Sequence, residues 1–395
     1  MAHGHNYLRF LREDNHMGSQ SRPIRVLQIV TRMNTGGVAV LIGNLMRNYD
    51  ADAFEFKLVA GVCDGSEEDY LQAIARDIPA VKIASLQRAI SPIKDLAAFI
   101  KIVKVIREFK PDVIHTHTSK AGLLGRLAGI TAYPRAKRVH TYHGHLLDGY
   151  FSKVKTHLLI LCEVALAKRT HRLIAMGTQV ERDLLNAGVG KKSQFSVLFP
   201  GVAEVSAVAK DKARRDLGLD ADAIYCLFVG RLTQIKRPDR LLDVVAELKR
   251  RNVPVSFLIA GDGDLNEYVK NRISSEDLPV TMLGWQKDMA GVFSAADILI
   301  LCSDNEAVSL ALIEGSQYSL PLVSTNVGSV SDVVINGSTG LLTESTAGGL
   351  ADAVAKLVGD AALRKAMGEA GKARATEYFS LDRMVKDHGD LYRSL

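Results

Sequence analysis

Short apolar runs alternate with segments of helical periodicity along most of the 395-residue chain. Residues 93–109, for example, repeat apolar positions at helical spacing and carry lysine and arginine along one side. Seven runs in the first half are typical of buried strands: residues 25–30, 54–62, 81–84, 112–117, 138–142, 172–175 and 195–198. Because helical segments separate these strands, the pattern predicts βαβ units and a parallel sheet.

The same alternation restarts after residues 199–201, whose Phe-Pro-Gly sequence is typical of a linker. The second half contains predicted strands at residues 224–229, 255–260, 280–283, 296–301 and 321–325, and closing helices at 349–358, 361–378 and 381–395. We therefore expect an α/β protein of two doubly wound, Rossmann-like domains that face a central cleft. The expected segments are a disordered extension (1–22), two domains (23–200 and 201–378) and a C-terminal helix that packs back on the first domain (379–395).

The composition is that of a soluble globular protein, with 47% apolar and 24% charged residues. No apolar run approaches the roughly 20 residues that span a bilayer, and residues 1–22 lack the apolar region of a signal peptide. The four cysteines are far apart and form no CxxC pair, so neither a zinc site nor a disulfide framework is indicated. These features predict a cytoplasmic protein.

Charge is distributed unevenly between the two halves of the chain. Residues 1–200 contain 28 Lys and Arg against 17 Asp and Glu, whereas residues 201–395 contain 22 against 27. The first half therefore carries a net charge of +11 and the second a net charge of −5. This asymmetry indicates an anionic partner for the first half, although no motif resembles those of nucleic-acid-binding proteins.

Two glutamates, Glu306 and Glu314, are separated by seven residues where a predicted strand gives way to a predicted helix. Ligands of open α/β sheets bind at this kind of junction. The ordinary alternative is a solvated helix that carries two acids. Eight residues of helix rise about 12 Å, so the two carboxylates are too far apart to act on one small group.

Several loops that follow predicted strands are suited to an anion. Gly36-Gly37 precedes a helix but is not GxGxxG, so a nicotinamide dinucleotide is not favoured. Arg231 and Lys236, five residues apart, can flank a diphosphate. Their loop is not a Walker A P-loop, because no Ser or Thr follows Lys236. Gly261-Asp262-Gly263 forms a further strand-end turn. For Gly36-Gly37 the alternative is a simple tight turn. For the loop of Arg231 and Lys236 the alternative is a basic surface loop.

Histidines gather at two predicted strand ends of the first half. His143 ends a strand at the cleft, where its imidazole is able to donate to a sugar hydroxyl or stabilise developing charge. A histidine bonded within a turn is the alternative. His115 and His117 lie on one strand, and we expect that they do not both face the core. Residues 116–122 are a better candidate for a polar loop on the acceptor side.

Taken in order, these motifs resemble those of the retaining glycosyltransferases of family 4. The resemblance spans residues 24–390 and is strongest over 224–345. It rests on Gly36-Gly37, His143-Gly144, Gly230-Arg231 with Lys236, Gly261-Asp262-Gly263, and Glu306 and Glu314 in an E-x7-E frame. Residues 115–122 and 140–145 are similar to bacterial members that build surface polysaccharides. The resemblance implies the GT-B fold, with domain 23–200 binding the acceptor and domain 201–378 the nucleotide sugar.

The resemblance implies roles for residues around the nucleotide. Glu314 would accept hydrogen bonds from both ribose hydroxyls, and Arg231 and Lys236 would bind the diphosphate and stabilise the leaving group. Backbone around Trp285 and Gln286 would contact the base. The glycines expected to approach the donor are Gly36, Gly37, Gly230, Gly261 and Gly263, with the N–H of Gly37 directed to the β-phosphate.

The resemblance also implies roles at the reacting carbon. Glu306 and His143 would contact donor-sugar hydroxyls, which makes His143, Arg231, Lys236 and Glu306 the expected catalytic residues. The departing phosphate takes the acceptor's proton on the same face, so neither a protein nucleophile nor a metal or other cofactor is expected. Acceptor contacts are expected at His117, Lys120 and His145.

Three positions depart from the family pattern. Ala307 replaces a glycine that follows the first glutamate, and its Cβ is expected to narrow the approach to the sugar. Gly328-Ser329 replaces paired glycines. Phe199-Pro200-Gly201 replaces Asn-Gly at the linker, where the fixed φ of proline is expected to stiffen the hinge.

The leading interpretation is a retaining, metal-independent transferase that moves a hexose from a nucleoside diphosphate sugar, favoured to be UDP-linked, to a hydroxyl of a lipid-linked or polysaccharide-precursor acceptor. A sugar-nucleotide 2-epimerase of the same fold is the alternative, although it needs an acid/base carboxylate pair that the N-terminal half does not clearly supply. A non-catalytic scaffold is a third class, against which the intact Glu314, Arg231 and Lys236 argue.

Two basic segments of the first half, residues 101–110 and 153–172, are suited to an anionic membrane surface. Solvated helix faces are the ordinary explanation. The net charge of the first half favours docking, which would give a peripheral location on the inner face of the cytoplasmic membrane.

Overall fold

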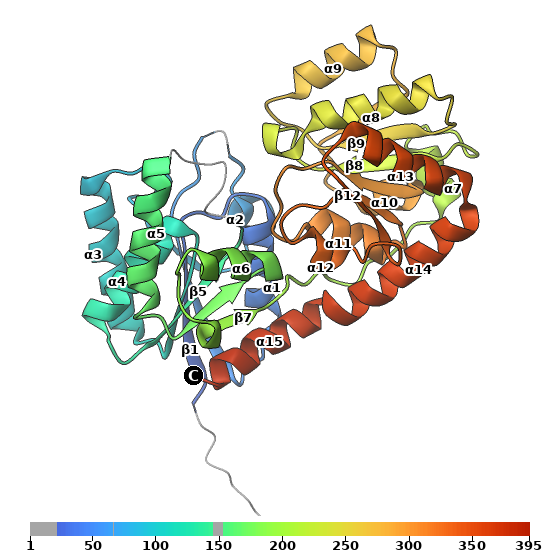
Figure 1. The fold of residues 1–395 in the computed structure, drawn as a ribbon. Helices are drawn as coiled ribbons and strands as arrows, with labels where there is room; N and C mark the ends of the chain where they lie inside the picture. Colours follow the sequence, from blue (N-terminus) through green and yellow to red (C-terminus); the bar gives the residue numbers. More distant parts are fainter. Residues whose placement is uncertain (1–21, 66, 145–152) are drawn as a thin grey trace, which may run out of the picture.

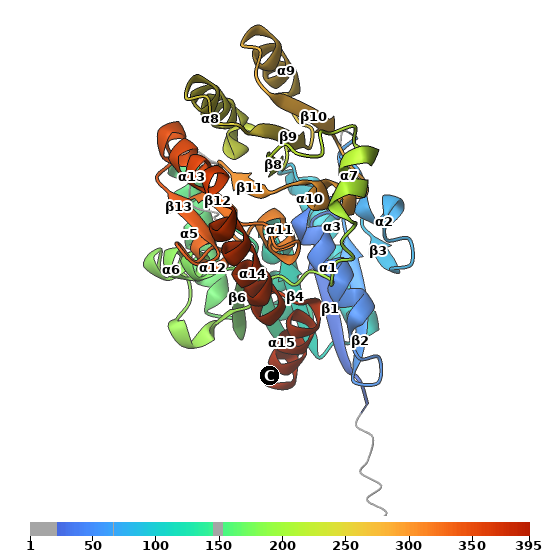
Figure 2. The same ribbon diagram turned by 90° about the vertical axis from the view of Figure 1, so that its right-hand side faces the viewer.

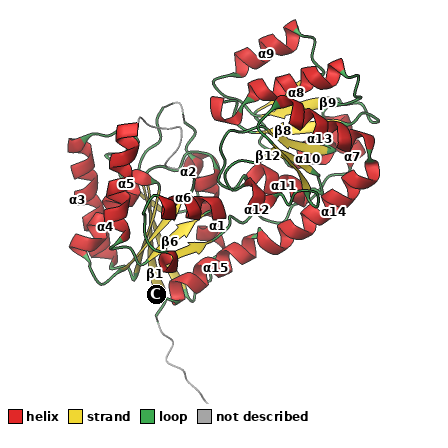
Figure 3. Ribbon diagram, in the orientation of Figure 1, coloured by secondary structure: helices red, strands yellow, loops and turns green. Residues whose placement is uncertain are grey.

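The structure is a computed structural model that describes residues 22–65, 67–144 and 153–395. Figure 1 shows two lobes, and Figure 3 shows that strands form the interior of each lobe while helices flank them. Neighbouring strands within each sheet pair in parallel. The α/β class, the two doubly wound sheets and the GT-B architecture are therefore confirmed.

The first lobe contains a seven-stranded sheet in the order β3-β2-β1-β4-β5-β6-β7. Its strands are β1 (Ile24–Val30), β2 (Phe54–Ala60), β3 (Ala80–Lys82), β4 (Val113–His117), β5 (Lys137–Tyr142), β6 (Arg172–Ala175) and β7 (Phe195–Val197). The strand order reverses between β1 and β4. A crevice forms outside the carboxyl ends of the strands at such a reversal.

Helices cover both faces of this sheet. They are α1 (Gly37–Asn48), α2 (Tyr70–Ala73), α3 (Pro92–Phe109), α4 (Ser119–Ala132), α5 (Lys153–Ala167) and α6 (Thr178–Asn186). Apolar side chains of α3 and α4 form the core on one face, and those of α1 form the core on the other. Because both faces are covered, β4 is buried along its whole length.

The second lobe contains a six-stranded sheet in the order β10-β9-β8-β11-β12-β13. Its strands are β8 (Tyr225–Val229), β9 (Ser256–Ala260), β10 (Val280–Gly284), β11 (Ile298–Leu301), β12 (Leu322–Thr325) and β13 (Gly340–Thr343). Its helices are α7 (Lys210–Asp216), α8 (Pro238–Arg250), α9 (Asn266–Ser275), α10 (Ala290–Ala295), α11 (Leu310–Gln317), α12 (Val330–Val333), α13 (Ala347–Gly359) and α14 (Ala361–Tyr378). Here the order reverses between β8 and β11.

The chain passes between the lobes twice, and the two crossing segments lie side by side. After α14 the chain returns to the first lobe as α15 (Leu381–Arg393), which packs against α1, as Figures 1 and 2 show. At the crossing, Val202 N donates to Phe379 O at 2.9 Å and Leu381 N donates to Val202 O at 3.0 Å. A Cβ on Gly201 would lie 2.6 Å from Ser380 O, so the close contact of the two segments requires glycine there.

Two elements were not predicted from the sequence, and one was predicted too long. The strand β13 was missed because its four residues begin with glycine and are too few for a periodic signal. The helix α7 was missed because it is short and mostly charged. Between the second and third strands, where the alternation of strands and helices predicts a helix over residues 67–76, only the single turn of α2 forms.

Across residues 22–65, 67–144 and 153–395, we found no helix with the length and apolar character needed to cross a bilayer.

Candidate functional site

The carboxyl ends of the two sheets face each other, and loops from both lobes come into contact there. Gly37 begins α1 in the first lobe, and a Cβ on it would lie 3.4 Å from Leu310 Cδ1 at the start of α11. A Cβ on Gly144, which follows β5, would lie 3.7 Å from Ala307 Cβ. The segment 303–310 of the second lobe is therefore packed against both glycine-containing loops of the first.

Glu306 and Lys236 form an ion pair within this contact region. Lys236 Nζ lies 2.5 Å from Glu306 Oε1, and Ser303 Oγ donates to the same carboxylate oxygen at 2.6 Å. Both side chains of the ion pair are largely buried, with 23% and 10% of their surface exposed. The pair fixes Glu306 and leaves other hydrogens of the ammonium group available to an anion.

Two further arginines hold the loop of Glu306 in place. Arg237 Nη1 and Arg240 Nη2 lie 3.1 and 2.6 Å from Asp304 Oδ1, and Asp304 N donates to Ile235 O at 2.9 Å. These bonds join the loop after β8 to the loop after β11. The relative position of Lys236 and Glu306 is therefore set by a network rather than by one ion pair.

Arg231 differs from Lys236 because its side chain is exposed and has no ion-pair partner in the part of the chain that the structure describes. Its guanidinium group is therefore free to bind an anion. Its backbone is fixed by the neighbouring turn, since Leu232 N donates to Asp262 O at 3.0 Å.

The glycines after β8 and β9 are required for close packing of the backbone. A Cβ on Gly261 would lie 2.0 Å from Gly230 O, and a Cβ on Gly263 would lie 2.6 Å from Leu232 O. Gly230 N donates to Ala260 O at 3.1 Å, Gly261 N to Gly284 O at 2.8 Å, and Gly263 N to Asp262 Oδ1 at 2.7 Å. Their amides thus have protein acceptors, and these glycines shape the turn that carries Arg231.

Gly36 and Gly37 are placed differently, at the N-terminus of α1. Within the described residues no side chain caps this helix, so the first-turn N–H groups have no side-chain acceptor. These N–H groups and the positive end of the helix dipole together favour an anion.

Glu314 and Glu306 lie in different kinds of structure. The sequence suggested that both belong to one helix, but α11 begins at Leu310, so Glu306 lies in the preceding loop and only Glu314 is helical. Burial raises the pKa of Glu314 to about 7. Its carboxylate has no hydrogen-bond partner among the residues described, so a ligand that donates hydrogen bonds would stabilise its charge.

Trp285 and Gln286 follow β10 at one end of the second sheet. Trp285 is exposed, whereas the Gln286 side-chain amide donates to Leu283 O at 2.6 Å. The indole ring is thus open to solvent, and the Gln286 side chain is engaged in its own turn.

His143 lies at the end of β5, next to Gly144. Its Nε2 lies 2.9 Å from Nδ1 of His117, and Nε2 of His117 lies 2.6 Å from Gln28 Oε1. Burial, together with a smaller effect of His388, lowers the pKa of His143 to about 3, so its imidazole is neutral. The histidine is therefore part of a network that extends into the first lobe.

His115 and His117 correct one expectation from the sequence. Both are completely buried on β4, although we expected that they would not both face the core. Burial lowers the pKa of both well below the usual value, so both are neutral. Hydrogen bonds at the ring nitrogens compensate for their burial.

The predicted acceptor residues are not gathered on one open surface. His117 has no exposed surface, so it does not lie where an acceptor would touch it directly. Lys120 Nζ lies 2.6 Å from Asp95 Oδ1 and also donates to Ala89 O, so its charge is engaged with the start of α3. His145 lies outside the described residues.

A second contact between the lobes, which we did not predict from the sequence, lies at the N-terminus of α6. Thr178 N and Thr178 Oγ1 donate to the two carboxylate oxygens of Asp332 at 2.7 and 2.6 Å, and Gln179 N donates to Ser329 Oγ at 3.2 Å. Ser329 N in turn donates to Glu306 O at 3.1 Å. Ser329, which departs from the family pattern, was the only signal in the sequence.

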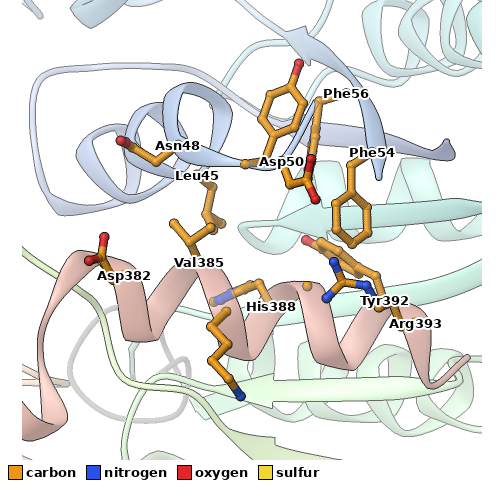
Figure 4. Close-up of a pocket in the computed structure, with 13 residues that line it drawn as sticks. Leu45, Asn48, Asp50, Phe54, Phe56, Asp382, Val385, His388, Tyr392 and Arg393 are labelled. Carbon is orange, nitrogen blue, oxygen red and sulfur yellow. The ribbon is translucent and has the colours of Figure 1, made fainter. Parts of the chain in front are cut away.

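A cavity of about 290 Å³ lies elsewhere, between α15 and the segment from α1 to β2 (Figure 4). Leu45 and Phe54 on one side and Val385 and Tyr392 on the other are among its lining residues. Its described lining includes none of the predicted site residues, so the contact region between the lobes remains the candidate site.

Two family models match successive parts of the chain. Residues 35–204 match the model described as glycosyltransferase family 4, and residues 209–374 match the model described as glycosyl transferases group 1. The two matches fall on the first and second lobes, respectively.

Named glycosyltransferases match along most of the chain. It is 31% identical over 290 residues to the UDP-Gal:alpha-D-GlcNAc-diphosphoundecaprenol alpha-1,3-galactosyltransferase of Escherichia coli, with 71% of this chain and 74% of that protein covered. It is 22% identical over 344 residues to the capsular polysaccharide biosynthesis glycosyltransferase CapM of Staphylococcus aureus, with 84% and 88% covered.

Solved structures share the fold. HepE of Anabaena, crystallised with UDP and glucose, superposes with a TM-score of 0.80 at 20% identity, with 94% of this chain and all of that chain covered. The lipopolysaccharide outer core galactosyltransferase WaaB superposes with a TM-score of 0.70 at 16% identity, with 94% and 100% covered.

Proposed function

The chain belongs to glycosyltransferase family 4, and we propose that it transfers a hexose from a UDP-sugar to a hydroxyl group of a lipid-linked saccharide, with retention of the anomeric configuration. The observation that carries this proposal is the Lys236–Glu306 ion pair at the contact between the lobes. It joins a diphosphate-binding cation to a carboxylate suited to sugar hydroxyls, opposite the two glycine loops of the first lobe.

The substrate classes are supported by the relatives. The Escherichia coli relative is named for a UDP-sugar donor and a diphosphoundecaprenol-linked acceptor, and HepE was crystallised with UDP and glucose. The exposed Trp285 is suited to stacking on a base, and Glu314 to accepting hydrogen bonds from the two ribose hydroxyls.

Phosphate binding is assigned to both lobes. Arg231 and Lys236 would bind the diphosphate from the second lobe, and the free N–H groups at Gly37 would bind it from the first. As the bond from the sugar C1 to the phosphate oxygen breaks, negative charge grows on that oxygen. These preorganised positive groups stabilise the growing charge, which lowers the barrier.

The acceptor oxygen attacks on the face from which the phosphate departs. A new bond forms between the acceptor oxygen and C1, and the acceptor's proton moves to the departing phosphate. Glu306 and His143 would hold the hydroxyls of the donor sugar during this step. The Cβ of Ala307, which lies against Gly144, would limit the size of the sugar that enters.

The acceptor class also requires a route to the membrane, and we propose that the outer surface of α3 supplies it. Ile93, Leu96 and Ile100 are 84%, 61% and 59% exposed on this helix. Lys104 and Arg107 continue the same exposed face. An apolar stripe that continues into basic residues fits an anionic bilayer.

The position of this face agrees with the proposal. Because α3 and α5 begin after the carboxyl ends of parallel strands, their N-termini lie at the edge of the first lobe that faces the other lobe. Leu158 and Leu161 are also exposed in the middle of α5, and α4 lies between α3 and α5 (Figure 1).

The catalytic proposal is tested with the purified chain, a panel of UDP-sugars, a diphosphoundecaprenol-linked saccharide and EDTA. We expect acceptor-dependent release of UDP with one donor, and an α-linked product from an α-linked donor by NMR. Absence of UDP release with every donor would contradict the proposal. Exchange of the proton at the sugar C2 without an acceptor would instead indicate an epimerase.

A further inference from the structure

A continuous chain of buried polar side chains connects His143 with the C-terminal helix. From His143 it passes through His117 to Gln28, whose Nε2 lies 3.1 Å from the hydroxyl of Tyr392 on α15. The Tyr392 hydroxyl lies 2.7 Å from Nδ1 of His115. Nε2 of His115 lies 2.7 Å from Oγ1 of Thr141. Apart from His143 at the end of the chain, all of these residues are buried.

The direction of every hydrogen bond in this chain follows from the orientation of the Gln28 amide, whose oxygen faces His117 and whose NH₂ group faces Tyr392. Its carbonyl oxygen only accepts, so Nε2 of His117 must carry a hydrogen. Since burial keeps His117 neutral, its Nδ1 has no hydrogen and must accept from Nε2 of His143. His143 is neutral as well, so its remaining nitrogen, Nδ1, is an acceptor.

At its other end, the Gln28 amide in the same orientation sets the direction of the remaining hydrogen bonds. Its NH₂ group donates to the Tyr392 oxygen, and the Tyr392 hydroxyl donates in turn to Nδ1 of His115. Nε2 of His115 then carries a hydrogen and donates to Thr141. Reversing the Gln28 amide would reverse every hydrogen bond of the chain, so the orientation of this one amide sets the tautomers of His115, His117 and His143 together.

We propose that Gln28 and Tyr392 are positioning residues that fix the tautomer of His143, so that its Nδ1 accepts a hydrogen bond from a hydroxyl of the donor sugar. This inference rests on the proposed function for the identity of the sugar. In the described part of the chain Nδ1 of His143 has no partner, and the neighbouring Gly144 lies against Ala307. The sequence alone had suggested a donating imidazole.

Tyr392 makes this tautomer depend on the docking of α15. The residue belongs to the last helix of the chain, and its ring packs edge-on at 6.0 and 6.1 Å from those of Phe54 and Phe56. Figure 4 shows Tyr392 beside Phe54 at the cavity next to α15. The C-terminal helix therefore contributes to the orientation of a group at the contact between the lobes.

The first test needs no substrate. The tautomer of His143 is measured by ¹⁵N NMR on full-length protein with labelled histidine, with its signal assigned by the loss seen in His143→Asn. We expect hydrogen on Nε2 of His143 in the wild type, and a mixture or hydrogen on Nδ1 in Tyr392→Phe and Gln28→Leu. Hydrogen on Nδ1 in the wild type, or an unchanged tautomer in both variants, would overturn the inference.

The second test uses the UDP-sugar that the wild type turns over. We expect Tyr392→Phe and Gln28→Leu to lower kcat by about ten- to a hundredfold, the range typical for removal of a partner that orients a metal-bound histidine. The donor KM should change less than kcat. Tyr49→Phe is the matched control, since Tyr49 packs on Phe56 in the same aromatic group and its hydroxyl has no partner among the described residues.

A changed tautomer with unchanged kcat would also overturn the assignment. If no UDP-sugar is turned over, the proposed function fails, while the NMR measurement still decides whether Gln28 and Tyr392 set the tautomer.

Discussion

Glu314 and Glu306 show how two identical side chains acquire different properties. Glu306 is neutralised by Lys236, whereas Glu314 is buried, has no ion-pair partner among the described residues, and has its pKa raised by burial to about 7. Glu306 is thus suited to hold a sugar through hydrogen bonds to its paired carboxylate. Glu314 becomes a full carboxylate only above neutrality or when a ligand stabilises its charge.

This difference predicts pH-dependent binding of UDP. Ribose hydroxyls that donate to Glu314 favour its ionised form, so binding lowers the pKa and is strongest above pH 7. Below pH 7 we expect the affinity for UDP to fall by up to about tenfold per pH unit. Calorimetry at pH 6, 7 and 8 measures this slope. Glu314→Gln controls for the titration of UDP itself, and an equal slope in both proteins would contradict the prediction.

Lys236 should contribute mainly to the transition state. Removing one preorganised positive group from a developing anion typically costs about 10²–10³ in kcat, so Lys236→Ala should lose turnover by this amount. UDP-release kinetics measure the loss. Lys249→Ala is the control, because Lys249 lies on the last turn of α8 and forms an exposed ion pair with Asp277. Turnover of Lys236→Ala equal to that of the control would mean that the diphosphate binds elsewhere.

At the scale of elements, a buried ion pair fixes α4, α5 and β5 together. Nη2 of Arg126 lies 2.8 Å from both carboxylate oxygens of Glu163, and the Tyr142 hydroxyl donates to the same carboxylate at 2.7 Å. Arg126 is completely buried. Since His143 follows Tyr142 directly, this group also fixes the end of β5.

Glu163→Ala should therefore destabilise the first lobe strongly. Removing one partner of a buried pair leaves an uncompensated charge and typically costs about 3–5 kcal/mol. Denaturant unfolding followed by circular dichroism measures this change. Glu108→Ala should cost less than about 1 kcal/mol, because Glu108 lies 3.8 Å from Lys104 on an exposed helix face. Similar losses in both variants would contradict the assignment.

The N-terminus of α6 gives a prediction about the contact between the lobes. A Cβ on Gly177 would lie 2.3 and 2.5 Å from Oγ and Cβ of Ser329, yet the extended backbone of Gly177 accepts alanine without strain. Gly177→Ala should thus push the lobes apart without unfolding either one. We expect the donor KM to rise by about five- to 150-fold, which corresponds to about 1–3 kcal/mol of lost binding energy.

The rescue variant distinguishes this effect from a general defect. Gly177→Ala combined with Ser329→Gly removes the steric conflict and should restore KM toward that of Ser329→Gly alone. Gly359→Ala, where a Cβ would meet nothing within 4 Å, is the neutral control. A double variant as poor as Gly177→Ala would show that Ser329 is not the obstacle.

At the scale of the whole molecule, the proposed docking face of α3 predicts salt-sensitive binding to vesicles that contain phosphatidylglycerol. Neutralising Lys101, Lys104 and Arg107 should weaken binding by about 1 kcal/mol per residue. Leu96→Glu should weaken it further by removing an apolar contact. Co-sedimentation measures binding, with Lys365→Ala on α14 as the control. Binding that is absent or insensitive to salt would exclude this face.

Much of the fold and the family of this protein could be predicted from the sequence alone. Periodicity of apolar residues predicted the strands of both sheets except β13, because a strand covered on both faces must be apolar along its length. The order of the motifs was sufficient to indicate glycosyltransferase family 4. Local sequence also placed glycines where strand-end turns require close backbone packing, as at Gly261.

Only the tertiary structure decided which polar groups meet. His115 and His117 are buried because Tyr392, more than 270 residues later, supplies a hydrogen-bond partner to the network, and periodicity along β4 carries no information about that partner. Likewise, nothing in the sequence around Thr178 indicates that its hydrogen-bond partner is Asp332 in the other lobe. Apolar burial is a property of each segment, whereas a buried hydrogen bond depends on two segments that the fold alone brings together.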